Sequence, residues 1–226
     1  MTFTLIASDP AQGLLGVATA SRSLAVGRSV PALDPTVGAA ASQAWTNRGL
    51  RHHLLASLRA GDSAAQAAAK IPELDIDHAY RQAAVVARTG GVGVHTGELT
   101  PGWSGHVGGE DYAAVGNCLT GADVVEAMAE TFDAGRAAPP GQLDPLLEFA
   151  QLLVAALEAG DAAGGDSRGR ESAALLVAST SDRRLSPPEV AVDLRVDHHA
   201  WPVRELRRLL LHRIAEFDGG VPRGQS

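Results

Sequence analysis

Two residue types are scarce in this chain, and each scarcity excludes a class of protein. The 226 residues include one cysteine, Cys118, and one lysine, Lys70. A single cysteine cannot form an internal disulfide or a cysteine-rich metal cluster, which fits a reducing cytoplasm. Because lysine is scarce and the net charge is -7, the basic stripe that a nucleic-acid surface requires is not expected.

Long apolar runs and a secretory signal are absent as well. No run approaches the length of a membrane span, so no contact with a membrane is predicted. The N-terminal stretch has neither the basic start nor the unbroken apolar segment of a secretory signal. A hydrophobic content of 45% is enough for one well-packed domain. We place that single domain at residues 1–218 and predict a disordered tail at residues 219–226.

Motifs for metals and phosphates are missing too. The pairs His52-His53 and His198-His199 point to different sides of a helix or strand, and no His-Glu-x-x-His pattern occurs. The glycine-rich loop 164–170 lacks the ending of a P-loop and leads into a strand instead of a helix. We therefore predict neither a metal site nor another cofactor.

What is present begins at the amino end of the chain. Residues 2–7 are rich in strand formers, residues 9–13 have turn chemistry and residues 14–20 are apolar, which predicts a β-hairpin. Thr2 is small enough for Met1 to be removed easily. A threonine exposed in this way carries a hydroxyl nucleophile and its own α-amine as the general base. From the hairpin alone, a chain that simply starts with a buried strand is the favoured explanation.

Apolar periodicity predicts groups of strands that alternate with pairs of helices. Further strands are expected at residues 37–44, 82–88, 92–96, 103–107, 112–118, 172–179 and 190–196. Helices are expected at residues 49–59, 63–70, 123–134, 145–160 and 201–217, with caps at 47, 63, 120–123 and 144. Paired helices between groups of strands suit an α+β fold in four layers, an αββα sandwich with helices outside two packed sheets.

Several separated motifs resemble the domain-of-unknown-function family 1028. They lie at residues 1–4, 18–22, 24–27, 42–47, 116–117 and 163–175, and the resemblance extends from the amino end to about residue 214. It implies a fold like that of the N-terminal-nucleophile (Ntn) hydrolases. The family name assigns no activity.

Thr2 matches the position at which this superfamily places its nucleophile. In threonine-type members, such as proteasome β-subunits, a lysine and an aspartate near the nucleophile tune it. Here the only lysine is Lys70, so Arg22 or Arg168 would have to supply the positive charge. An arginine cannot exchange a proton at neutral pH, which departs from the family pattern.

Other candidates lie at strand ends and in the glycine-rich loop. Asn117 is predicted to be catalytic as a donor to the oxyanion. The residues predicted to bind substrate are Ser21, Arg22, Gln43, Asn47, Asp166 and Arg168. Each has a structural alternative, since Asn47 suits an N-cap, Asn117 a turn and Arg22 a surface ion pair.

Two functions remain open at this point. The first is a cytoplasmic amidohydrolase in which the Thr2 hydroxyl attacks a small amide or peptide-like substrate. The second is a binding or assembly protein that keeps the fold without the chemistry. The missing lysine favours the second, whereas Thr2 and the clustered polar motifs favour the first, which we adopt. Apolar helix faces in excess of one small core predict a homodimer.

Overall fold

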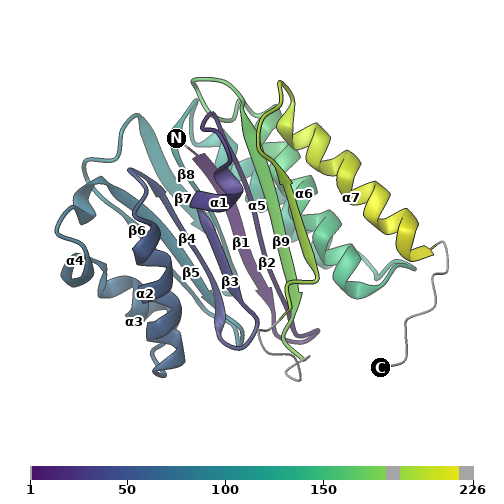
Figure 1. Cartoon of the computed structure of the whole chain (residues 1–226), viewed down its shortest axis with the longest axis horizontal. Coiled ribbons are helices and arrows are strands. Elements are labelled where there is room, and N and C mark those ends of the chain that lie inside the picture. Colours follow the sequence, from purple (N-terminus) through teal and green to yellow (C-terminus); the bar gives the residue numbers. More distant parts are fainter. Residues whose placement is uncertain (1, 182–188, 219–226) are drawn as a thin grey trace.

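The computed structural model describes residues 2–181 and 189–218 and contains two antiparallel sheets with helices outside them (Figure 1). Its strands are β1 (Thr2–Asp9), β2 (Leu14–Ser21), β3 (Pro31–Asp34), β4 (Gly38–Ala44), β5 (Arg81–Ala87), β6 (Val92–Thr96), β7 (Trp103–Gly108), β8 (Tyr112–Leu119), β9 (Ser172–Ser179) and β10 (Val192–Val196). Its helices are α1 (Val26–Ser29), α2 (Arg48–Arg59), α3 (Ala64–Ala69), α4 (Ile71–Leu74), the 3-10 turn η1 (His78–Tyr80), α5 (Asp123–Ala137), α6 (Pro145–Ala162) and α7 (Pro202–Asp218). The tail predicted at residues 219–226 lies outside the described residues.

Strand β1 lies in the middle of the larger sheet. The six-stranded sheet has the order β10-β9-β2-β1-β8-β7, and the four-stranded sheet has the order β3-β4-β5-β6. In the β1–β2 hairpin, Thr2 pairs with Ser21, while on its other side Thr2 pairs with Asn117 of β8. The predicted hairpin is confirmed, and its first residue is held between two neighbouring strands.

The side chains of β1 alternate between two layers of the molecule. Phe3 packs in the core between the six-stranded sheet and its helices, whereas Ile6 packs between the two sheets. Thr4 faces the same way as Ile6, since its hydroxyl donates to Gln43 of β4. Thr2 is two residues before Thr4 and therefore faces the same way, so its side chain lies at one end of the layer between the sheets.

Helices cover the outer faces of both sheets. Helices α2 and α3 pack on the four-stranded sheet, and α5, α6 and α7 pack on the six-stranded sheet (Figure 1). Leu50 and Leu54 supply the apolar stripe of α2, and Met128 and Phe132 supply that of α5, as their three- and four-residue spacing predicts. The α+β class predicted from the periodicity is thus observed. No helix in the described ranges is both long and apolar enough to cross a membrane.

The helix starts show which capping signals are reliable. Asn47 accepts a hydrogen bond from the backbone N–H of Gly49 at 2.9 Å, and Ser63 forms a full capping box, both as predicted. Asp144 caps α6 in the same way. The cap predicted at residues 120–123 is wrong, because α5 begins after Ala122 without a side-chain cap.

The structure adds short elements where the sequence predicts a loop or a helix end. Strand β3 and helices α1 and α4 have four residues each, too few for a periodic pattern to be recognised. Tertiary contacts stabilise two of them, because the buried Arg51 guanidinium donates to the carbonyls of Arg28 and Pro31. Segments this short are not stable by propensity alone.

Candidate functional site

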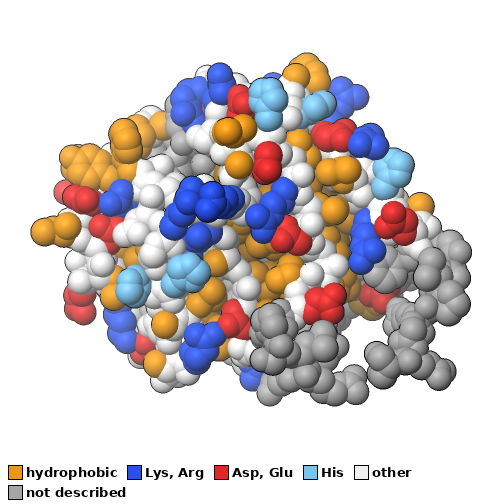
Figure 2. Space-filling model, in the orientation of Figure 1, with side chains coloured by type: hydrophobic (Ala, Val, Ile, Leu, Met, Phe, Trp, Pro, Cys, Tyr) orange, Lys and Arg blue, Asp and Glu red, His pale blue; other side chains and the backbone are white. Residues whose placement is uncertain are grey.

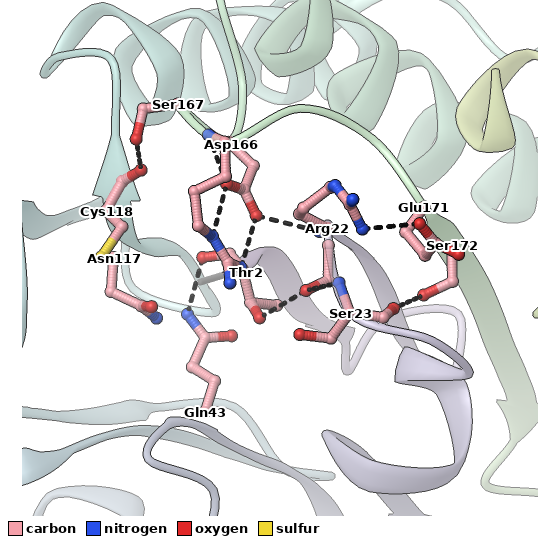
Figure 3. Close-up of polar contacts among 12 residues, drawn as sticks. Thr2, Arg22, Ser23, Gln43, Asn117, Cys118, Asp166, Ser167, Glu171 and Ser172 are labelled. Carbon is pink, nitrogen blue, oxygen red and sulfur yellow. Dashed lines mark hydrogen bonds and ion pairs between the residues drawn. The ribbon is translucent and has the colours of Figure 1, made fainter. Parts of the chain in front are cut away.

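Thr2 is buried, with 4% of its surface exposed, at the end of the layer between the sheets (Figure 3). Its Oγ1 donates to Ser21 Oγ at 3.2 Å, and the same Ser21 oxygen accepts from the backbone N–H of Ser23 at 3.0 Å. The carbonyl of Thr2 accepts from Gln43 Nε2 at 3.3 Å. A strand with two neighbours therefore holds the hydroxyl in a fixed position, which a nucleophile requires.

A network of buried amides lies beside Thr2 between the two sheets. Gln82 Oε1 accepts from Gln43 Nε2 at 2.8 Å and from Asn117 Nδ2 at 3.0 Å. Gln82 Nε2 donates to the carbonyl of Gly116 at 2.8 Å. All three amides are 0% exposed, and buried amides need such partners. The network fixes the ends of β4, β5 and β8 relative to one another.

Asn117 lies next to Thr2, but its amide nitrogen is already engaged. Because Nδ2 donates to Gln82, the predicted hydrogen bond to an oxyanion would have to replace an existing one. Asn117 Oδ1 is buried and has no hydrogen-bond partner in the described part of the chain. The Asn117 side chain therefore offers a hydrogen-bond acceptor to the site, instead of the predicted donor.

The glycine-rich loop lies across the ends of β2 and β8 (Figure 3). The buried Asp166 accepts from the backbone N–H of Arg22 at 2.9 Å and from that of Arg168 at 3.0 Å, and it also forms an ion pair with the Arg168 guanidinium. Ser167 Oγ donates to the carbonyl of Cys118 at 2.7 Å. The Asp166 carboxylate therefore ties the loop to the end of β2, and Ser167 ties it to the end of β8.

Three other predicted substrate-binding residues have structural partners. Arg22 Nη1 forms an ion pair with Glu171 at 2.7 Å, which is the surface alternative considered above. Asn47 caps α2, and its Nδ2 donates to Asp75 Oδ2 at 2.8 Å. Gln43 contacts the backbone of Thr2 from the buried side. Gln43 thus helps to position Thr2, whereas the side chains of Arg22 and Asn47 are engaged with partners away from Thr2.

A small cavity of about 190 Å³ opens on Thr2. Its lining consists of Thr2, Ser21, Ser23, Leu24, Val26, Ser29, Val30, Ala44, Thr46 and Arg48. Hydroxyls and one guanidinium thus face a few aliphatic side chains. Pockets for drug-sized ligands measure about 300–1,000 Å³, so this cavity suits a small polar group.

The sequence prediction missed Ser23, Thr46 and Arg48 as cavity residues. Thr46 and Arg48 flank the predicted Asn47, and Ser23 follows the predicted Arg22. The available signal was that these residues are adjacent in sequence to predicted site residues. Adjacency does not show which of two neighbouring side chains faces the cavity, because that depends on the direction of the backbone after each strand ends.

Three non-glycine residues with left-handed backbone lie at or near this cavity, and no others occur in the described ranges. They are Ala25 with φ 53°, Ala44 with φ 68° and Cys118 with φ 51°. Such backbone costs about 1–3 kcal/mol per residue and is concentrated at functional sites. Ala44 lines the cavity, Ala25 lies between two lining residues, and Cys118 follows Asn117. The strain is therefore centred on the surroundings of Thr2.

Cys118 is a second potential nucleophile close to Thr2. Its Sγ donates to the carbonyl of Pro101 at 2.7 Å. Burial raises the pKa of the thiol above its ordinary value. A thiol that stays protonated is a poor nucleophile, so the Thr2 hydroxyl is the better candidate.

The histidine pair near the carboxyl end has ordinary partners. His198 Nδ1 pairs with Glu171, and His199 Nδ1 accepts from the backbone N–H of Trp201 at 3.0 Å. In residues 2–181 and 189–218, no group of three or more His, Cys, Asp or Glu side chains is arranged to hold a metal ion.

Comparisons with known proteins identify the family. The model of the family of unknown function DUF1028 matches residues 2–206. A crystal structure of a Silicibacter pomeroyi protein with the same family label superposes with a TM-score of 0.79 at 34% identity, over 93% of this chain and 85% of that chain. No curated protein matches the chain. These relatives share the fold and name no reaction.

Proposed function

This chain belongs to the DUF1028 family of unknown function, and we propose that it is an amide hydrolase with an N-terminal nucleophile. One observation carries the proposal: Thr2 begins a central strand, is buried, donates to Ser21 and opens on a small hydroxyl-lined cavity. We also propose that the two sheets and their outer helices form the four-layer αββα sandwich of the N-terminal-nucleophile hydrolases. The fold alone would not assign the reaction.

Removal of Met1 would provide the base. A free α-amine has a pKa near 8, so a substantial fraction is unprotonated at neutral pH. Asn117 is the register partner of Thr2, and its buried Oδ1 lacks a partner among the described side chains and backbone groups. We expect this oxygen to accept a hydrogen bond from the α-amine and so to orient the amine lone pair.

The proposed reaction has two steps, acylation of Thr2 and hydrolysis of the resulting ester. Thr2 Oγ1 attacks the amide carbon while the α-amine takes the hydroxyl proton, which gives a tetrahedral oxyanion. The C–N bond breaks, the proton passes to the leaving amine, and the acyl group remains on Oγ1 as an ester. In the second step the α-amine takes a proton from water, hydroxide attacks the ester, and the carboxylic acid leaves as Oγ1 regains its proton.

The side chains of Ser23 and Thr46 are the proposed oxyanion donors. Both line the cavity, and neither hydroxyl has a hydrogen-bond partner among the described residues. In other enzymes, one donor of this kind contributes about 2.7–4 kcal/mol to the transition state. This assignment replaces the Asn117 amide nitrogen, which donates to Gln82.

One observation favours the alternative of a binding or assembly protein. Lys70 forms an ion pair with Asp62 beside α3 and does not line the cavity, so no lysine is available to tune the nucleophile. In the hydrolase proposal, the α-amine must act without that help. The predicted cytoplasmic location and homodimer stay predictions.

The decisive test compares two chains that differ only at the terminus. One is processed to begin at Thr2, and the other keeps a single glycine before it, which converts the α-amine into a peptide nitrogen. Intact mass and N-terminal sequencing define both samples and the natural product. We expect hydrolysis of small N-acyl amino acids by the first chain and a loss of at least about 100-fold in the second, the usual contribution of a general base.

Substitutions at Thr2 complete the test. Thr2→Ser keeps a hydroxyl and should retain measurable hydrolysis and an acyl adduct at residue 2 by mass spectrometry. Thr2→Ala should lose both while unfolding at the same urea concentration. Natural protein that still begins with Met1, or equal rates for the chains with and without the extra glycine, would overturn the mechanism and favour a binding function.

A further inference from the structure

A cluster of arginines borders the Thr2 cavity. Figure 2 shows Lys and Arg side chains gathered over α1, in the middle of the face that is drawn. Arg28 belongs to α1, and Arg48 and Arg51 belong to the first turn of α2, which lies against it. Arg48 Nη2 donates to Ser29 Oγ at 3.1 Å, and both residues line the cavity. The Arg48 guanidinium is therefore part of the cavity wall.

Arg48 differs from Arg22 and Arg168, which lie on the other side of Thr2's surroundings, in lacking an acidic partner among the described residues. Arg22 pairs with Glu171, and Arg168 pairs with Asp166. Among the described residues, Arg48 has no carboxylate within 4.0 Å and no side-chain hydrogen bond other than that to Ser29. Most of its N–H donors are free to meet a ligand.

The neighbouring Arg51 adds to the unbalanced positive charge. Its guanidinium is buried and donates to the carbonyls of Arg48, Arg28 and Pro31. Burial and the charge of Arg48 both lower the pKa of Arg51. Two like charges without a neighbouring acid repel one another, and a bound anion would relieve that repulsion.

We propose that Arg48 binds the carboxylate of a small amide substrate while the scissile carbonyl lies at Thr2 Oγ1. This inference rests on the proposed hydrolase function and names its substrate class: an amino-acid-sized amide with a free carboxylate. The planar guanidinium matches a carboxylate in geometry. The aliphatic wall of Leu24, Val26 and Val30 fits a short apolar portion, and the volume of about 190 Å³ suits a group the size of an amino acid.

The test separates binding from catalysis. N-acetylglycine and N-acetylglycinamide differ only in the carboxylate, and calorimetric titration into the Thr2→Ala protein measures both affinities without hydrolysis. We expect the acid to bind at least about tenfold more tightly than the amide, as for a charge-assisted hydrogen bond. Arg48→Ala in the same background should abolish that preference, and Arg48→Lys should keep part of it because the charge remains.

Arg204→Ala is the matched control. Arg204 is an exposed arginine on α7, on the other side of the six-stranded sheet, and it has no ion pair among the described residues. Its removal changes the net charge equally and should leave both affinities unchanged. Equal binding of acid and amide, no binding of the acid, or the same loss in Arg204→Ala would overturn the role of Arg48.

A separate hydrolysis assay uses the chain that begins at Thr2. It distinguishes a failure of the carboxylate site at Arg48 from a failure of the proposed hydrolase function. Selective binding of N-acetylglycine without acetate release would support the carboxylate site and count against the hydrolase. Release of acetate from acid and amide at equal rates would support the hydrolase and overturn the specificity assigned to Arg48. Selective release from the acid, lost in Arg48→Ala, would support both.

Discussion

The layer between the two sheets has one apolar end and one polar end, although the same strands build both. At the apolar end, Ile6 and Val17 pack against Val86 with all three side chains buried. At the other end, Gln43 and Gln82 are equally buried but are joined by hydrogen bonds. Thr2 belongs to the polar end.

The two ends of the layer contribute in different ways: the apolar end mainly stabilises the fold, and the polar end mainly positions side chains. Burying one large aliphatic side chain contributes about 1.5–3 kcal/mol, whereas a typical internal hydrogen bond contributes about 0.5–1.5 kcal/mol net. The apolar end therefore supplies more of the free energy of folding. Hydrogen bonds are directional and costly to leave unmade, so the polar end fixes where Thr2 and Asn117 lie.

The largest expected effect comes from the apolar end. Ile6→Ala should lower the free energy of unfolding by about 2–5 kcal/mol, because it leaves a cavity between the sheets. Urea unfolding measures the loss, and the surroundings of Thr2 should give unchanged amide chemical shifts. The control Leu211→Ala, at a side chain that is 47% exposed, should change stability by less than about 0.5 kcal/mol. Similar losses in both variants would contradict the assignment of stability to this end.

An intermediate effect is expected at the polar end. Gln82→Met keeps the approximate size of the side chain but removes the acceptor for Gln43 and Asn117, which should cost about 1–3 kcal/mol. In contrast to Ile6→Ala, it should shift the amide resonances of Thr2 and Asn117. Gln142→Met, at an exposed position, is the control. Unshifted resonances in the Gln82 variant would show that the network does not position Thr2.

The smallest effect is expected at a polar cluster outside this layer. Burial of Asp75 favours its neutral form, but hydrogen bonds from Arg81, Asn47 and the Asp77 N–H outweigh burial and lower the pKa to about 2. Asp75→Asn should destabilise the protein by about 1–2 kcal/mol at pH 7.

The loss of stability in Asp75→Asn should depend on pH in a definite direction. A folded pKa below the unfolded value near 3.9 means that the ionised Asp75 stabilises the fold above about pH 4. That stability is lost as pH falls from about 4 to about 2, so the difference between wild type and Asp75→Asn should shrink over this interval. Glu110→Gln, at an exposed acid, is the control for the loss of one carboxylate. A constant difference for Asp75→Asn would contradict the pKa argument.

Much of the fold could be predicted because its long strands are almost wholly buried and its long helices bury one face. The run of strand formers in β1 and the apolar stripe from Leu50 to Leu58 in α2 indicate burial directly, and the caps at Asn47 and Ser63 are local signals. Strand β3 and helix α1 could not be predicted, since they depend on contacts such as those made by Arg51. Their stabilising partner is distant in sequence.

The site was predicted less completely, because polar residues at strand ends look alike in a sequence. Asn117 was correctly placed beside Thr2, but its hydrogen bond to Gln82 depends on how the two sheets meet. Gln82 itself has the appearance of an ordinary polar residue at the start of an apolar strand. In the sequence, Arg48 is an ordinary polar residue at a helix start, and only the fold turns it toward Ser29.

The order of the strands also bears on aggregation. Edge strands expose unpaired backbone groups to which another chain can add. Here the edges of the six-stranded sheet are the glycine-containing β7 and the short β10, where Asp193 and Arg195 form an ion pair. One edge of the smaller sheet is β3, which has four residues and begins with Pro31. Short, charged or proline-bearing edges oppose the addition of a neighbouring molecule at these three strands, which protects the long apolar strands behind them.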